Sequence, residues 1–117
     1  MAKRQSGSYV VVLVTCGTRR EATQIARAVV QQRLAACVNI LEAPVNSIYR
    51  WKGKVERARE FLLLIKTSRK RLAVLQQQIA TLHSYEVPEF IALPIVAGAP
   101  NYLAWLSECL DSPIKSR

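Results

Sequence analysis

The stretch SIYRWKGKVERAREFLLLIKT, residues 47–67, decides the fold that the sequence predicts. Two runs that can form strands flank Lys52-Gly53-Lys54, and Gly53 can take the positive φ angle that a tight turn requires. The second run ends in Phe61-Leu62-Leu63-Leu64-Ile65, which is apolar enough to be buried on both faces. We therefore predict a long β-hairpin whose base lies inside the domain. Its tip is too polar and too distant to be covered by the domain's own helices.

The first strand of this hairpin is predicted to run from about Ala35 to Trp51. Pro44 interrupts it, and proline has no backbone N–H to donate to a neighbouring strand. We therefore expect a bulge or an edge position at Pro44.

The segment before the hairpin predicts a strand followed by a helix. Tyr9–Val14 is apolar almost throughout and rich in valine, as is typical of a central strand. Thr18-Arg19-Arg20-Glu21 has the pattern of a capping box, in which Thr18 accepts a backbone N–H and Glu21 reaches back to the cap. Apolar residues then recur at helical spacing, so we predict a helix over residues 18–33.

A second helix, a further strand and a last helix are predicted after the hairpin. Ser68 can cap the second helix, and Phe90–Val96 forms a strand that Pro94 places at least partly on an edge. The last helix begins near Pro100. The apolar face expected for the second helix consists of Leu72, Leu75, Ile79 and Leu82. The last helix carries Tyr102, Trp105, Leu106 and Cys109.

The order of these elements predicts an α+β fold of the ferredoxin-like βαββαβ type, with a long central hairpin and a C-terminal helix. In this fold we expect the helices to pack on one face of the sheet. The other face and the hairpin edges then need burial, because exposed edges invite association. Tyr49 and Trp51 alternate onto one side of the hairpin and are predicted to anchor an interface in a closed oligomer.

Composition predicts one cytoplasmic domain over residues 9–112, with a disordered tail over residues 1–8 and a short tail over residues 113–117. The chain has 117 residues, a common size for a single core. Its apolar runs are far shorter than the ~20 residues that span a membrane, and its polar N-terminus does not resemble a signal peptide. Three widely spaced cysteines indicate neither a disulfide framework nor a zinc site.

The net charge of +9 leaves two interpretations open, a binder of nucleic acid or a solvated basic surface. Arg69-Lys70-Arg71 and the hairpin tip are the basic clusters. Neither a recognition-helix motif nor the aromatic signature of an RNA-binding sheet accompanies them, so nucleic acid is an unlikely partner.

Five blocks in order resemble the CutA family of divalent-cation tolerance proteins. The resemblance covers about residues 11–110 and implies a cytoplasmic ferredoxin-like homotrimer, related in architecture to the PII signalling proteins. It also implies binding of copper(II) or other divalent metals. The sequence departs from the usual family pattern at two places, at Thr15-Cys16-Gly17-Thr18, outside these blocks, and at His83-Ser84-Tyr85, within one of them. The five blocks are Leu34-Ala35-Ala36-Cys37-Val38-Asn39-Ile40, Ser47-Ile48-Tyr49-Arg50-Trp51-Lys52-Gly53-Lys54, Leu64-Ile65-Lys66-Thr67, His83-Ser84-Tyr85-Glu86-Val87-Pro88-Glu89 and Tyr102-Leu103-Ala104-Trp105-Leu106.

His83 is the one candidate metal ligand that the sequence offers. Imidazole suits copper, but a tight site needs three or four ligands, which would come from another subunit or from Cys16 or Glu89. The structural alternative is a histidine that bonds the last carbonyls of the second helix. In either case no metal is expected to be required for folding.

A second constellation suits a small anion in a cleft between subunits: Lys66, Tyr85, Glu89, Tyr102 and Trp105. The alternative is a buried Lys–Glu pair with tyrosines that satisfy backbone groups. The sequence has no nucleophile motif and no glycine-rich phosphate loop, so we do not expect an enzyme.

Overall fold

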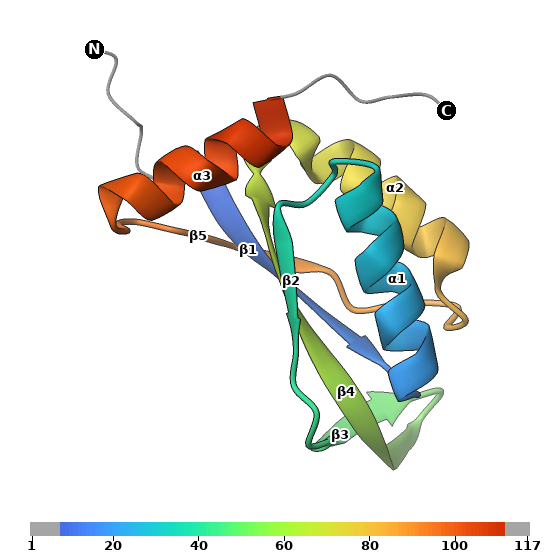
Figure 1. The fold of residues 1–117 in the computed structure, drawn as a ribbon. Coiled ribbons are helices and arrows are strands. Elements are labelled where there is room, and N and C mark those ends of the chain that lie inside the picture. Colours follow the sequence, from blue (N-terminus) through green and yellow to red (C-terminus); the bar gives the residue numbers. More distant parts are fainter. Residues whose placement is uncertain (1–7, 112–117) are drawn as a thin grey trace.

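The computed structural model of the protein describes residues 8–111 and confirms the ferredoxin-like α+β fold (Figure 1). The predicted tails lie outside the described residues, apart from Ser8, whose carbonyl accepts a hydrogen bond from the Arg69 N–H at 3.0 Å. Within residues 8–111 no helix is long and apolar enough to cross a membrane. The elements are β1 (Tyr9–Cys16), α1 (Arg19–Gln31), β2 (Cys37–Ile40), β3 (Val45–Trp51), β4 (Lys54–Ser68), a 3₁₀ turn η1 (Arg69–Arg71), α2 (Leu72–Leu82), β5 (Ile91–Pro94) and α3 (Pro100–Asp111).

The sheet is antiparallel, with the strand order β2-β4-β1-β5, and β3 pairs with the outer part of β4. The two central strands are therefore β1 and β4, as their apolar runs predicted. Val12 faces Ile65 across one side of β1 and Ala92 across the other. Strand β5 is an edge strand of the described sheet, which agrees with the position expected for Pro94.

The main core lies between one face of the sheet and the helices α1 and α2, which lie side by side (Figure 1). Alternate residues of β1 and β4 supply the strand side of this core. Two details of α2 differ from expectation. Ser68 makes no side-chain capping bond, because a 3₁₀ turn follows it and α2 begins only at Leu72. Leu82, the last residue of α2, is 39% exposed. The buried core residues are Val10, Val12, Val14, Cys16, Ala22, Ile25, Val29, Leu34, Ala35, Leu63, Ile65, Leu75 and Ile79.

Helix α1 begins as predicted, but only half of the capping box forms. The Glu21 N–H donates to the Thr18 hydroxyl at 3.1 Å. The Glu21 carboxylate does not turn back to the cap. It accepts bonds from the Ser84 N–H at 2.6 Å and the Ser84 hydroxyl at 3.1 Å. Glu21 therefore ties the first turn of α1 to the segment that follows α2.

The prediction that all helices pack on one face of the sheet is wrong for helix α3. Its buried residues Leu106 and Leu110 form a second cluster with Tyr9 and Ala36. Because Tyr9 alternates with Val10 along β1, this cluster lies on the opposite face from the main core. Figure 1 shows α3 across one end of the strands, where Arg33 donates to the Cys109 carbonyl at 2.9 Å.

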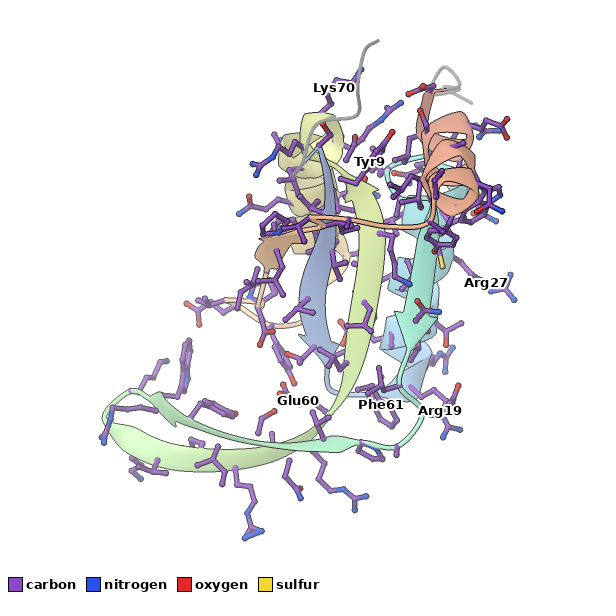
Figure 2. The ribbon with its side chains drawn as sticks, turned by 90° about the vertical axis from the view of Figure 1, so that its left-hand side faces the viewer. Tyr9, Arg19, Arg27, Glu60, Phe61 and Lys70 are labelled. Atoms are coloured by element: carbon purple, nitrogen blue, oxygen red, sulfur yellow. The ribbon has the colours of Figure 1, made fainter. Side chains whose placement is uncertain are left out.

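The hairpin has the break and the turn that the sequence predicted. Ile40 faces Leu63 whereas Val45 faces Glu60, so the residues at positions 41–44, including Pro44, bulge opposite only two residues of β4. At the tip, Lys52 and Gly53 both have positive φ angles, 52° and 83°, as in a two-residue type I′ turn. Figure 2 shows the β3–β4 hairpin bent away from the domain body.

The sheet face opposite α1 and α2 is apolar and only partly covered in one chain. Val11 and Leu13 of β1 are half-buried, and their partners on β5, Leu93 and Ile91, are 47% and 49% exposed. Leu64 of β4 faces Leu13 on the same side. We call this surface, made by Val11, Leu13, Leu64, Ile91 and Leu93, the open face.

Candidate functional site

His83 lies directly after α2 and joins that helix to β1. Its backbone N–H bonds the Ile79 carbonyl at 2.8 Å, which closes the last turn of the helix. The imidazole is buried, with Nε2 2.8 Å from the Thr15 carbonyl oxygen, so Nε2 is the donor. The other ring nitrogen, Nδ1, accepts the Tyr85 N–H at 3.1 Å. Both nitrogens thus have partners within the chain.

Within one chain, one carboxylate lies close to the His83 ring. The Glu21 Oε2 atom is 3.7 Å from His83 Nδ1, and each of the two atoms accepts a backbone N–H, from Ser84 and Tyr85 respectively. Cys16 is fully buried, and burial, with smaller contributions from Glu21 and Glu60, raises the pKa of its thiol to about 12. It therefore stays protonated and is a poor ligand. The residues at 8–111 contain no group of three or more histidine, cysteine, aspartate or glutamate side chains placed to hold a metal ion.

A pocket of about 680 Å³ lies between the β3–β4 hairpin and the segment that follows His83. Three of its lining residues are glutamates, and its described lining includes no lysine, arginine or histidine. We call it the acidic pocket. Its lining residues are Thr15, Ser47, Ile48, Tyr49, Trp51, Glu60, Tyr85, Glu86, Val87 and Glu89.

Glu60 is the most deeply buried acid of this pocket, with 6% of its surface exposed. The Tyr85 hydroxyl donates to Glu60 Oε2 at 2.7 Å. The same hydroxyl lies so close to Gly17 that it leaves little room for a larger residue there. A Cβ atom at Gly17 would lie 3.2 Å from the Tyr85 oxygen. Figure 2 shows Glu60 in the angle between the hairpin and the rest of the sheet.

The pKa values of two pocket groups are shifted upward. Burial, followed by repulsion from Glu60, raises the pKa of the Glu89 carboxyl. Burial also raises the pKa of the Tyr85 phenol, and its hydrogen bond to Glu60 adds to the shift. In both groups, burial and the neighbouring Glu60 make the charged form less favourable than it would be in water.

Glu89→Gln should change how stability depends on pH. Since the pKa of Glu89 is raised in the folded state, folding holds its proton more tightly than the unfolded chain does. This contribution is complete below the ordinary glutamate pKa of about 4.3 and is lost as pH rises through the raised value. Urea unfolding between pH 4 and pH 7 should show the wild type losing stability relative to Glu89→Gln as pH rises. If the stabilities of the wild type and Glu89→Gln changed in parallel with pH, the raised pKa of Glu89 would be contradicted.

The five residues predicted to form one cleft fall into two groups within the chain. Tyr85 and Glu89 line the acidic pocket. Lys66 instead donates to the Asn39 side-chain oxygen, on the face of the sheet that α3 partly covers. The rings of Tyr102 and Trp105 on α3 are tilted by 39°, with their centroids 5.5 Å apart. Burial, with a smaller effect of Cys37, raises the pKa of the Tyr102 phenol. Cys37 is the strand partner of Lys66.

The two predicted interface aromatics also line the acidic pocket. Tyr49 and Trp51 are 43% and 38% exposed in the single chain. Sequence analysis did not select Glu60, their neighbour in the pocket. The strand register provides the missing signal, because Val45 faces Glu60 and Tyr49 lies on the same side of the hairpin as Val45.

Comparison with known proteins identifies the family of this chain. The family model described as CutA1 divalent ion tolerance protein matches residues 10–109. The chain belongs to this family. The mouse Protein CutA is 45% identical over 106 residues, which are 91% of this chain and 59% of the mouse protein. The chain therefore spans little more than half of that relative.

Bacterial CutA relatives match over nearly their full length. The divalent-cation tolerance protein CutA of Thermus thermophilus is 48% identical over 98 residues, which are 84% of this chain and 94% of that protein. A solved structure of the divalent cation tolerance protein from Thermus thermophilus superposes with a TM-score of 0.83 at 47% identity, covering 86% of this chain and 96% of that chain. The family description names tolerance to divalent ions and no chemical reaction.

Proposed function

We propose that this CutA1-family chain acts as a cytoplasmic homotrimer that binds copper(II) or another divalent metal and carries out no catalysis. The observation that supports metal binding is the juxtaposition of His83 and Glu21. Their Nδ1 and Oε2 atoms lie 3.7 Å apart, and imidazole with carboxylate is a donor set that divalent transition metals accept. The remaining ligands would come from water or from a neighbouring subunit.

The open face and the hairpin support the homotrimer. Five apolar residues cluster on one side of the sheet, and the tip residues Ile48 and Val55 are 71% and 66% exposed. Apolar surface of this kind marks an association site, and a projecting hairpin can pair with a neighbouring sheet. Tyr49 and Trp51 are the aromatic anchors that we propose for this interface.

The cysteines support a cytoplasmic location. Cys16, Cys37 and Cys109 all have free thiols. Unpaired cysteines are typical of reducing compartments, whereas small secreted domains use disulfides.

Copper titration tests the metal proposal. Calorimetric titration of the metal-free trimer with Cu²⁺ should give a saturable isotherm, and His83→Gln should weaken it at least about tenfold, since a primary ligand is lost. The exposed acid Glu108 provides the control variant Glu108→Gln, which should bind like the wild type. An unchanged isotherm in His83→Gln would remove His83 from the site. We expect that folding itself needs no metal, so the protein should still unfold in one cooperative transition in the presence of a chelator.

A second candidate function is the sensing of a small anion, as in a PII-like protein. Lys66, Tyr102 and Trp105 support it because they gather on the sheet face partly covered by α3, outside the acidic pocket. A neighbouring copy would bring Tyr85 and Glu89 to this group to complete the predicted cleft. A thermal-shift screen of anionic metabolites should then find a stabilising compound whose effect is lost in Lys66→Gln. A screen without any such compound would count against this function.

A further inference from the structure

The two sides of the β3–β4 hairpin differ in charge. Successive residues of a strand point to opposite sides, and Glu60 marks the inner side, in the angle between the hairpin and the rest of the sheet (Figure 2). Val45 faces Glu60 and Tyr49 faces Glu56 across the two strands. Both acidic residues of positions 45–60 therefore lie on the inner side, and the outer side has none.

Three exposed arginines occupy the outer side, and we call Arg50, Arg57 and Arg59 the arginine row. Arg57 and Arg59 are two positions apart on β4, and Arg50 faces Val55, which places it diagonal to Arg57. Figure 2 shows long side chains that end in nitrogen on this side of the hairpin. Neighbouring side chains of like charge repel each other, so an anion that contacted the row would relieve this repulsion.

The arginine row has no carboxylate partner within the described chain. Among residues 8–111, none of its three guanidinium groups makes a hydrogen bond or an ion pair. Arg19 provides the contrast, because it bonds the Glu42 carboxylate at 3.0 Å. The row therefore presents unpaired guanidinium groups to a partner from outside the chain.

The spacing of the row indicates an extended acidic peptide. Side chains two positions apart on an antiparallel strand repeat every ~6.8 Å. An extended peptide with acids at alternate positions repeats its carboxylates at the same interval. Guanidinium groups bind carboxylates through two parallel hydrogen bonds, so the row matches such a peptide in charge and in period.

The aromatic residues of β3 argue against single-stranded nucleic acid as the partner. Proteins that bind such strands combine basic groups with aromatic rings on which the bases stack. Tyr49 and Trp51 lie on the inner side of the hairpin, with Glu60, and therefore not beside the arginine row. An anionic membrane requires positive charge but would not use the regular spacing.

We propose that the arginine row binds an extended acidic segment of another protein, with alternate carboxylates bonded to Arg57 and Arg59 and a further carboxylate bonded to Arg50. The aromatic anchors of the proposed subunit interface lie on the inner side, so the two contacts use opposite sides of the hairpin. The proposal goes beyond the metal function and does not depend on it.

Fluorescence anisotropy with the full-length protein tests this binding. The probe is a fluorescein-labelled peptide of alternating glutamate and threonine, and the control peptide has the same composition with all glutamates at one end. The wild type should bind the alternating peptide saturably and more tightly than the control. Arg57→Gln combined with Arg59→Gln should weaken binding by about tenfold. Arg20→Gln combined with Arg27→Gln removes the same charge from exposed positions of α1 and should stay within about twofold of the wild type.

Several results would overturn the proposal. Equal weakening by the two double variants, or equal binding of the two peptides, would mean that only net charge matters. Tighter binding of labelled oligothymidylate, or of vesicles that contain phosphatidylserine, would assign the row to nucleic acid or to a membrane. Light scattering should give the same mass for the wild type and the variant of Arg57 and Arg59, and a changed mass would assign the row to the subunit interface. The copper isotherm is recorded separately, so failure of the metal proposal is distinguishable.

Discussion

Leu93→Asp should convert the protein from a homotrimer into a folded monomer. Leu93 is on edge strand β5, faces Val11 on the open face and is 47% exposed in the single chain. If the open face is the interface, association buries an unpaired carboxylate on every subunit, which costs several kcal/mol. Association should weaken on the order of a hundredfold per interface. The isolated fold should persist, because an exposed edge position tolerates a polar side chain.

Light scattering and far-UV circular dichroism together check this result. At micromolar concentration, the wild type should have the mass of three chains and Leu93→Asp the mass of one, with matching dichroism spectra. Val74→Asp is the matched control, because Val74 is 49% exposed on α2, on the other side of the molecule from the open face. A wild type that scatters as a monomer, or a trimeric Leu93→Asp, would refute the predicted assembly.

The hairpin could be predicted because its determinants are local. Proline cannot donate to a ladder, and a glycine in a two-residue turn accepts a positive φ angle, whatever the rest of the chain does. The start of α2 could not be predicted as well. Ser68 has the composition of a cap, but it is the last residue of β4 and a 3₁₀ turn follows it. Leu82, at the last position of α2, is 39% exposed.

The candidate site was less predictable, because it depends on register and on distance along one strand. Glu60 lies in the charged segment VERARE, which resembles a solvated strand face. Only its pairing with Val45 places it beside the pocket. Lys66 and Glu60 are six residues apart on β4, or roughly 20 Å at the rise of an extended strand. One chain therefore cannot place Lys66 beside Tyr85, which contacts Glu60.

For His83 too, the position could be predicted from the sequence but the contacts could not. Its position after α2 could be predicted from the extended Val87-Pro88 segment and the end of helical spacing. Its partners could not, because Thr15 is 68 residues away in sequence. The ring joins β1 to the segment that lines the acidic pocket, so the structural alternative and the metal proposal involve the same atoms.

Ile65→Ala should destabilise the protein more than any other truncation proposed here. Ile65 lies at the buried end of β4, faces Val12 on β1 and Val38 on β2, and has 0% of its surface exposed. Removing its side-chain atoms beyond Cβ loses burial energy and leaves a cavity under α1 and α2. The expected loss of unfolding free energy is about 2–5 kcal/mol.

Val55→Ala provides the comparison on the same strand. Val55 is 66% exposed near the hairpin tip, so its truncation should cost the single chain less than about 1 kcal/mol. Urea unfolding of both variants at one fixed protein concentration measures the contrast, since association adds to the apparent stability. If the Val55→Ala loss approaches that of Ile65→Ala and grows with protein concentration, the hairpin tip is itself buried in the trimer. In that case the Ile65 end of strand β4 stabilises the fold of the single domain, and the Val55 end stabilises the association of the subunits.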